Sequence, residues 1–268
     1  MEVIAERINT SIKYIEKAYA EKNAKVIQEE ATKQVEAGAD IIDVNAGLKL
    51  ENNIERLVWA VDAVQEVTDV PLAVDSIHPK AIEAGLRRCR DVKRCFANSI
   101  TLQKNRLEGI LPFVKEMGCK VVGVTIDEKG SMPGYAQGRL EIAKRLAAAV
   151  DSHGIDLSLL YIDFMCLPVS MPNWYRQSLI SLESLRLIKK ELPEVKAMVN
   201  VSASTWKLPS RSLATRTFQA MLMASDLDAV LLNPLDRELM ATIVVAQTML
   251  GRDKDCAAYL AAHQEGRL

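Results

Sequence analysis

Short apolar runs that end in Asp or Asn recur along the chain. In the clearest copy, Leu72-Ala-Val leads into Asp75, with Pro71 before the run and Pro79 soon after it. This pattern predicts a buried strand with a polar residue at its exit, followed by a turn into a helix. Further copies end at Asn45, Asn98, Asp163 and Asn200.

Amphipathic stretches alternate with these runs, because apolar residues recur at spacings of three and four between them. Strands are predicted at 3–5, 41–45, 72–75, 94–98, 120–125, 159–163, 196–201 and 229–232. Helices are predicted from Asn23 to Gly38 and then at 54–64, 79–90, 107–117, 139–153, 175–191, 216–225, 236–250 and 256–262. Residues 6–9 are predicted to form a polar loop after the first strand.

The regular alternation of strands and helices favours an α/β protein with a parallel sheet, since its continuous apolar strands need cover on both faces. The chain has 268 residues, and about 250 residues is the usual size of a (β/α)₈ barrel. An open doubly wound sheet is the competing architecture. The chain has neither G-x-G-x-x-G after the first strand nor a P-loop, the phosphate motifs that such sheets often carry. The sequence therefore predicts a single (β/α)₈ TIM barrel, one domain spanning residues 1–268.

Composition excludes several classes of function. The net charge is −1, and no basic run with interleaved aromatic residues indicates a nucleic-acid partner. No apolar stretch approaches the ~20 residues that span a bilayer. The N-terminus lacks the pattern of a signal peptide, so a cytoplasmic location is expected. The five cysteines and three histidines show no metal-ligand spacing, so neither a disulfide framework nor a bound metal is expected.

The polar residues at the strand exits are the candidates for chemistry, because the C-terminal strand ends of such a barrel converge on one mouth. They are Glu6, Asn9, Asp43, Asn45, Asp75, Asn98, Thr125, Asp127, Asp163, Asn200, Ser202 and Asn233. Any one of them could instead cap a helix or hold a turn. The set lacks Lys and Arg apart from the neighbouring Arg7, which disfavours a phosphate substrate. Carboxylates and amides together suit a flat heterocycle with several N–H donors and ring-nitrogen acceptors.

Six segments carry a family resemblance, in order and at matching spacing. The chain resembles the pterin-binding methyltransferases, in particular those that exchange a methyl group between tetrahydrofolate and corrinoid proteins in acetogenic and demethylating metabolism. The segments are 5–9, 43–47, 73–76, 97–99, 161–163 and 199–202. The sequence departs from the acetogen form at 197–199, where Ala-Met-Val replaces Gly-Leu-Ser. The loop 203–207 also differs.

The resemblance implies a role for each matching residue. Asp75, Asn98 and Asp163 would hold the amino-pyrimidinone edge of the pterin, and Asn200 would be the catalytic residue that hydrogen-bonds N5. Supporting roles at the mouth fall to Glu6, Asn9, Asp43, Asn45 and Ser202. No cofactor would be tightly bound, because tetrahydrofolate is a substrate and cobalamin is presented by a partner protein. A homodimer is also implied. The consecutive apolar residues at 221–223 and 243–245 fit a second subunit, although cover by the last helix would explain them within one chain.

The reaction expected from this resemblance is methyl transfer from a methylcorrinoid protein to N5 of tetrahydrofolate. The reverse direction is the first alternative. A dihydropteroate synthase needs a basic pyrophosphate site and usually a Ser-Arg-Pro-Gly stretch, and the chain has neither. A non-catalytic subunit that docks a corrinoid protein is a further alternative. A Schiff-base aldolase is disfavoured because no lysine stands at an inner strand end.

Overall fold

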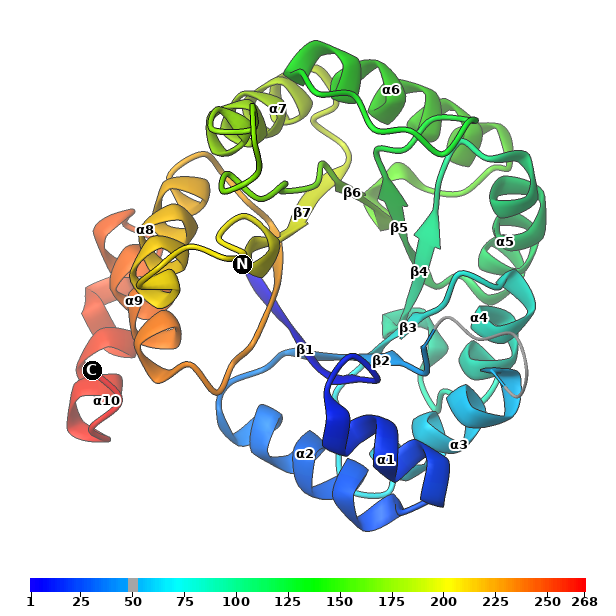
Figure 1. Ribbon diagram of the computed structural model, residues 1–268, viewed down its shortest axis with the longest axis horizontal. Coiled ribbons are helices and arrows are strands. Elements are labelled where there is room, and N and C mark those ends of the chain that lie inside the picture. The colour runs from blue at the N-terminus through cyan, green and yellow to red at the C-terminus, as the bar shows by residue number, and fades with distance from the viewer. Residues whose placement is uncertain (48–52) are drawn as a thin grey trace.

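Eight parallel strands close on one another in chain order, with β8 hydrogen-bonded to β1. The computed structural model of the protein describes residues 1–47 and 53–268. Figure 1 looks along the barrel and shows the strands at the centre with the helices around them. This arrangement confirms the predicted (β/α)₈ barrel. The strands are β1 (Glu2–Asn9), β2 (Ile41–Asn45), β3 (Leu72–Asp75), β4 (Phe96–Ile100), β5 (Lys120–Val124), β6 (Leu160–Asp163), β7 (Lys196–Asn200) and β8 (Ala229–Leu232).

The helices form an outer layer whose apolar faces pack on the barrel. They are α1 (Lys13–Glu21), α2 (Ala24–Glu36), α3 (Asn53–Gln65), α4 (Pro79–Leu86), α5 (Lys104–Met117), α6 (Ala136–Ser152), α7 (Gln177–Glu191), α8 (Arg211–Met223), α9 (Arg237–Met249) and α10 (Ala257–Gln264). Short 3₁₀ turns lie at Val92–Arg94, Leu157–Leu159, Val201–Ala203 and Lys254–Cys256. No helix in the described ranges is long and apolar enough to cross a membrane.

The first strand corrects the sequence prediction. Residues 6–9, predicted as a polar loop, are the second half of β1, and they pair with β2 after a shift in register between Ala5 and Ile8. Their polarity is misleading because the end of a barrel strand faces the mouth, where polar side chains are tolerated. The prediction of residues 3–5 therefore covered only the apolar part of this strand.

Helix α1 is a second correction, because no helix was predicted before Asn23. Its buried residues Ile15, Ala18 and Tyr19 follow helical spacing, so the signal was present in a segment that otherwise reads as charged. Asn23 does stand before α2, but its side chain makes no capping hydrogen bond.

Several predicted boundaries were also wrong, by two to five residues; α4, for example, ends at Leu86 and not at residue 90. The fourth strand runs from Phe96 to Ile100, shifted by two residues from the predicted 94–98, because a 3₁₀ turn occupies Val92–Arg94. Helix α8 begins at Arg211, ahead of the predicted start at 216.

The centre of the barrel is filled by one apolar side chain from each strand, a set that we call the apolar plug. Its members are at most 4% exposed: Ile4, Ile41, Ala73, Phe96, Val122, Tyr161, Met198 and Ala229. Phe96 and Tyr161 pack edge to face, with ring centroids 4.9 Å apart. Because side chains alternate along a strand, the residue two positions beyond each plug residue also points inward, one layer nearer the C-terminal end.

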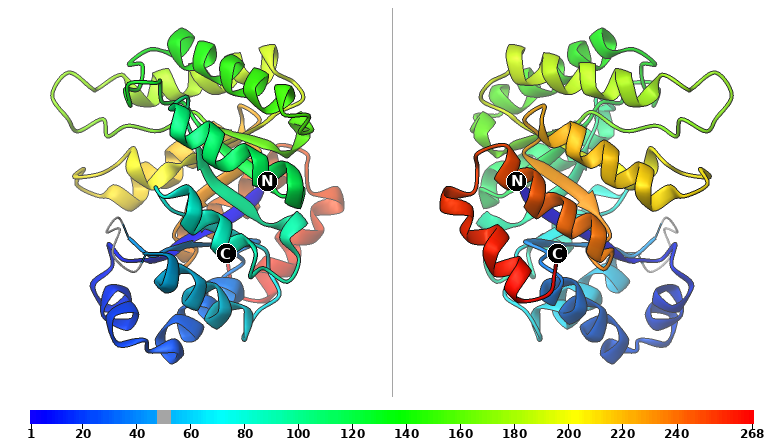
Figure 2. Two further views of the ribbon diagram at one scale, coloured as in Figure 1. Left: turned by 90° about the vertical axis from the view of Figure 1, so that its right-hand side faces the viewer. Right: turned by 90° about the vertical axis from the view of Figure 1, so that its left-hand side faces the viewer.

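Charged side chains also meet at the N-terminal end of the barrel, opposite the mouth. At the N-terminal end, the Glu2 carboxylate accepts from Lys120 Nζ at 3.0 Å and from the Tyr161 hydroxyl at 2.6 Å. Figure 2 shows the N-terminus on this side, while the segments that follow β6 and β7 extend from the opposite end. The inward lysine of β5 is thus separated from the mouth by the plug.

Candidate active site

A polar layer lies directly above the apolar plug. Two residues beyond the plug, six of the eight strands carry a carboxylate or amide: Glu6, Asp43, Asp75, Asn98, Asp163 and Asn200. Strands β5 and β8 carry Val124 and Leu231 at this height. The period of two along each strand therefore aims most of the predicted site residues into one mouth.

Two carboxylate–amide pairs form what we call the β2–β4 wall. Asn98 Nδ2 donates to Asp43 Oδ1 at 3.0 Å, and Asn45 Nδ2 donates to Asp75 Oδ2 at 2.6 Å. Strand register explains the second pair, because Asn45 lies opposite Asp75 on the neighbouring strand. The first pair joins β2 to β4 past β3, since Asp43 and Asn98 both belong to the inward polar layer. The structure thus brings these four predicted residues together on three adjacent strands.

A second group joins β7 to β1 across the mouth, and we call it the β7–β1 wall. The Glu6 carboxylate accepts from Asn200 Nδ2 at 2.9 Å and from Ser202 Oγ at 2.8 Å. Asn200 Oδ1 accepts from the N–H of Ala203 at 3.3 Å. Since each end of the amide meets a fixed partner, the orientation of Asn200 is set by Glu6 and by the turn after β7.

Asp163 and Asn9 stand apart from both walls. Asp163 Oδ1 accepts from the N–H of Met165 at 2.7 Å, and Asn9 Oδ1 accepts from the N–H of Ser11 at 2.9 Å. Both contacts are the local turn bonds that the capping alternative anticipated. In residues 1–47 and 53–268, neither side chain hydrogen-bonds another predicted site residue.

Three carboxylates of the polar layer hold protons more tightly than free aspartate does. Burial raises the pKa of Asp75 to about 6, although Asn45 and Arg106 partly offset it. Burial likewise raises the pKa of Asp163 to about 6, although the hydrogen bond from the Met165 N–H and the charge of Arg139 partly offset this rise. The pKa of Asp43 lies well above its usual value because of burial and the neighbouring charge of Asp75. Such shifts are frequent at functional sites.

Two buried arginines hold the loops beside the polar layer, a role that was not predicted. Arg106 donates to the carbonyl oxygens of Ser76, at 3.1 Å, and Ser99. Arg139, with 0% of its surface exposed, donates to the carbonyl of Met165 at 2.9 Å and to Gln177 Oε1 at 2.7 Å. Because their donors are occupied by protein oxygens, these arginines fix backbone and leave little capacity for a phosphate.

A cavity of about 590 Å³ opens beside the β7–β1 wall. The residues that line it include Glu6, Asn9 and Asn200, which were predicted as site residues, and Trp206 and Arg211, which were not. A tryptophan in a loop and an arginine at the start of a helix read as surface residues in the sequence. Asp75, Asn98 and Asp163 do not line this cavity, although all three are partly exposed; the cavity therefore occupies only one side of the mouth.

Metal ligation has no obvious place at the mouth. Within the part of the chain that the structure describes, no group of three or more His, Cys, Asp or Glu side chains has the arrangement to hold a metal ion. All five cysteines are free thiols, and three of them are buried.

Comparisons with known proteins agree with this geometry. Methylcorrinoid:tetrahydrofolate methyltransferase of Eubacterium limosum is 28% identical over 271 residues, covering 100% of this chain and 98% of that protein. Methionine synthase of Mycobacterium leprae is 25% identical over 215 residues, 76% of this chain but only 17% of that protein.

Solved structures and a family model complete the comparison. Dihydropteroate synthase of Xanthomonas albilineans shares the fold with a TM-score of 0.69 at 16% identity, over 94% of this chain and 93% of that one. The family model for pterin binding enzymes matches residues 6–233. This match spans both walls of the mouth and confirms the resemblance seen in the sequence: the chain belongs to the pterin binding enzyme family.

Proposed function

We propose that this enzyme transfers a methyl group between a corrinoid protein and N5 of tetrahydrofolate, in the direction from methylcorrinoid to tetrahydrofolate. The observation that carries the proposal is the layer of carboxylates and amides above the apolar plug, with the fixed amide of Asn200 at its edge. The similarity to the methylcorrinoid:tetrahydrofolate methyltransferase of Eubacterium limosum supports the direction.

The pterin ring is assigned to the side of the mouth that Asp75, Asn98 and Asp163 line. The carboxylates of Asp75 and Asp163 accept from the 2-amino and N3 donors of the amino-pyrimidinone edge. Asn98 uses its Nδ2 toward Asp43, which directs its carbonyl oxygen to a ring donor.

Asn200 is assigned to N5. Methyl transfer is an in-line displacement in which the bond from the methyl carbon to cobalt breaks as the bond to N5 forms. The electron pair stays with cobalt, and N5 loses its proton to water. Asn200 donates one N–H to Glu6, and its carbonyl oxygen keeps a lone pair that can accept from the N–H of N5 as this nitrogen becomes positively charged. An amide can follow this change because it offers a donor and an acceptor.

Cobalamin enters this proposal as a substrate carried by another protein. The described residues supply no obvious metal ligands of their own, and the mouth is open toward solvent beside Asn200. No tightly bound cofactor and a cytoplasmic location remain predictions from the sequence.

The test mixes the protein with methylcobalamin and tetrahydrofolate while the cobalamin spectrum and 5-methyltetrahydrofolate are followed together. Equal amounts of demethylated cobalamin and methylated folate are expected. Initial rates measured with methylcobalamin and tetrahydrofolate, and separately with demethylated cobalamin and 5-methyltetrahydrofolate, show which direction is faster. Folate binding without methyl transfer, even with a corrinoid protein present, would instead favour the non-catalytic docking subunit.

A homodimer through the outer helices is also proposed. Met221 on α8 is 47% exposed, whereas the adjoining Leu222 and Met223 are buried; on α9, Val245 is 37% exposed and Ile243 is buried. One side of each apolar run therefore faces away from the barrel, and α10 packs on α9 without covering all of it. Light scattering should give twice the 29.7 kDa chain mass, and a monomer at micromolar concentration would reject the dimer.

A further inference from the structure

The first strand carries one extra residue where it reaches the mouth. Glu6 and Arg7 of β1 together lie opposite the single residue Asp43 of β2. Such an insertion is a β-bulge, which bends a strand and changes the direction of its side chains. In a regular strand, Ile8 would point inward after Glu6. Ile8 instead packs in the core between barrel and helices, and Asn9 lines the cavity at the mouth. The bulge therefore determines which side chains of β1 face the mouth.

A glutamine on α2 supplies the hydrogen bond that holds the backbone of this bulge. The extra residue of a bulge leaves the ladder of bonds between strands, and here the N–H of Arg7 donates to Gln34 Oε1 at 3.0 Å. Gln34 is 0% exposed, and its Nε2 donates to the carbonyl of Glu30 at 3.3 Å. Both ends of this buried amide are thus bonded, as buried polar groups require.

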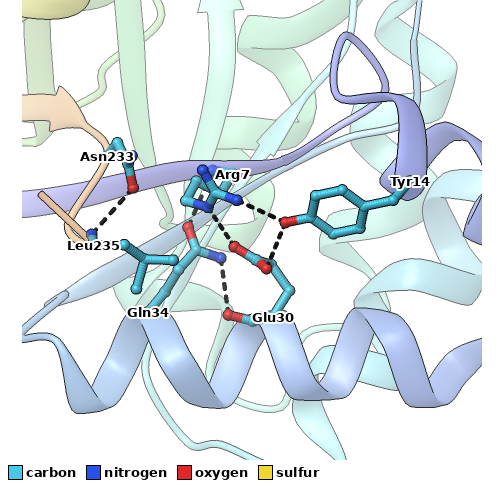
Figure 3. Close-up of polar contacts among 6 residues, drawn as sticks. All are labelled: Arg7, Tyr14, Glu30, Gln34, Asn233 and Leu235. Atoms are coloured by element: carbon cyan, nitrogen blue, oxygen red, sulfur yellow. Dashed lines mark hydrogen bonds and ion pairs between the residues drawn. The ribbon is translucent and has the colours of Figure 1, made fainter.

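The side chain of Arg7 is held as firmly as its backbone. Its Nε lies 2.5 Å from Glu30 Oε1, and its Nη2 donates to the Tyr14 hydroxyl at 2.7 Å, which in turn donates to Glu30 Oε2 at 2.7 Å. Figure 3 shows this closed ring, with Glu30 and Gln34 on α2 and Tyr14 on α1. Glu30 is buried, and charge-assisted hydrogen bonds are strong in such surroundings. We call Gln34, Glu30 and Tyr14 the bulge anchor.

The bulge anchor is connected to the mouth through one peptide group. The N–H that Gln34 binds belongs to the peptide that joins Glu6 to Arg7. The Glu6 carboxylate accepts from Asn200 at 2.9 Å and from Ser202 at 2.8 Å. It meets both donors only while this peptide keeps its direction. A contact made outside the mouth, on α2, therefore controls the group that orients Asn200.

Stability alone does not explain these residue types on α2. The face of α2 that is turned to the barrel also carries Ile27 and Ala31. Apolar side chains in place of a buried ion pair are often neutral for stability or stabilising, because burying a carboxylate is costly. The polar residues Glu30 and Gln34 are better explained by the geometry that they impose on Arg7.

We propose that the three residues of the bulge anchor are positioning residues for methyl transfer. They hold the bulge of β1 so that Glu6 keeps the amide of Asn200 in the orientation that the reaction needs. Gln34 is the central member, because it binds the peptide itself. The inference rests on the proposed function, which assigns Asn200 to N5.

The test measures kcat for methyl transfer from methylcobalamin to tetrahydrofolate, and tetrahydrofolate affinity by calorimetry, in Gln34→Met. Methionine keeps the length of the side chain but lacks the amide oxygen. We expect kcat to fall about three- to tenfold through looser positioning, while the affinity stays within about twofold. Tyr14→Phe removes one hydroxyl from a side chain that is 43% exposed. It should show the same split with about a twofold loss of kcat, and it serves as the test if Gln34→Met does not fold.

A double-mutant cycle with Glu6→Ala distinguishes positioning from general support of the fold. Once the Glu6 carboxylate is absent, Gln34→Met should lower kcat by less than about twofold further. Losses that multiply would mean that Gln34 acts independently of Glu6, which overturns the proposal. The matched control is Gln28→Met on the same helix, where the side chain donates to Glu66 in an exposed pair. It should leave kcat and affinity unchanged.

Nuclear magnetic resonance separates this inference from the proposed function, because it needs no activity. The side-chain N–H signals of Asn200, identified by their loss in Asn200→Ala, should move in Gln34→Met toward their positions in Glu6→Ala. They should stay in place in Gln28→Met. If wild type transfers methyl groups but Gln34→Met leaves these signals or kcat unchanged, the positioning role is wrong and the methyltransferase stands. If the signals move but wild type transfers no methyl group, the anchor does hold Asn200 and the methyltransferase is wrong.

Discussion

The two walls of the mouth use the same residue types for different purposes. In the β2–β4 wall, each carboxylate is paired with one amide, and burial keeps the pKa values of Asp43 and Asp75 high. In the β7–β1 wall, one carboxylate holds two donors beside an open cavity.

Under the proposed function, this contrast assigns folate binding to the β2–β4 wall and methyl transfer to the β7–β1 wall. Paired, desolvated acceptors discriminate strongly between ligands that satisfy them and ligands that do not, since an unmatched buried polar group is costly. An amide locked at the edge of a cavity instead contributes by position, and such a group affects rate more than binding. The β2–β4 wall should therefore govern affinity, and the β7–β1 wall should govern rate.

The largest effect is expected for Asn200→Ala. If Asn200 stabilises the positive charge that develops on N5 in the transition state, kcat should fall about 100-fold, the usual effect of removing one preorganised electrostatic contact, with a much smaller change in folate affinity. Single-turnover rates and calorimetry on the same preparation measure both. Equal losses in rate and affinity would mean that Asn200 acts in binding, as is expected of the β2–β4 wall, and would remove the contrast between the two walls.

Asp75→Ala should show the opposite pattern. Loss of a charged acceptor costs about 1.5–3 kcal/mol, so the affinity for tetrahydrofolate should fall about 10- to 100-fold. Calorimetry reports the affinity, and Asp62→Ala serves as the control because Asp62 pairs with Arg88 on the helical layer. A folded Asp75→Ala protein with unchanged affinity would refute the pterin assignment.

Through Asp75 and Asp163, acidity should affect folate affinity and protein stability in opposite senses. Asp75 and Asp163 have pKa values of about 6, and only the ionised forms accept two pterin donors. From about pH 7.5 to about pH 5.5, folate affinity should therefore fall about tenfold.

Stability of the free protein should change the other way over the same range. A carboxyl whose folded pKa exceeds its unfolded value binds its proton more tightly when folded, so these two groups stabilise the fold as pH falls. Thermal unfolding at several pH values tests this point. An affinity that stays constant, or a stability that falls, from about pH 7.5 to about pH 5.5 would contradict protonation of the two carboxyls in this range.

The smallest effect is expected for Glu6→Gln. The Gln side chain has one acceptor oxygen where Glu6 offers two, so Asn200 and Ser202 compete for it. The rate should fall about three- to tenfold through looser positioning, without loss of folate affinity. Ser202→Ala is the companion variant. In the Glu6→Gln/Ser202→Ala double mutant, Asn200 no longer competes with Ser202 for the single acceptor oxygen, so part of the rate should be restored.

Strand positions were the part of the fold that the sequence predicted best. The predicted ranges 41–45, 72–75 and 229–232 match β2, β3 and β8 at both ends, because their apolar runs are bounded by turn residues. Strand β1 was cut short because Glu6, Arg7 and Asn9 are polar, and α1 was missed because Ile15, Ala18 and Tyr19 are spread among charged residues.

The pairing within the mouth could not be predicted in the same way. Asp43 and Asn98 are 55 residues apart, and Glu6 and Asn200 are 194 apart. Which carboxylate meets which amide depends on barrel closure and register, and Asp and Asn fit either role. Arg211 was not predicted because its place in the lining of the cavity depends on how the segment after β7 folds.

The apolar plug also constrains the order of events. A barrel blocked at mid-height by Phe96, Tyr161 and their neighbours has a single entrance. Two substrates that meet at Asn200 must therefore share that entrance, and the one seated deeper cannot enter or leave while the other is docked. In the proposed function the pterin lies deep in the mouth beneath a protein-borne corrinoid, which gives a compulsory kinetic sequence: folate binds first, and its product departs last.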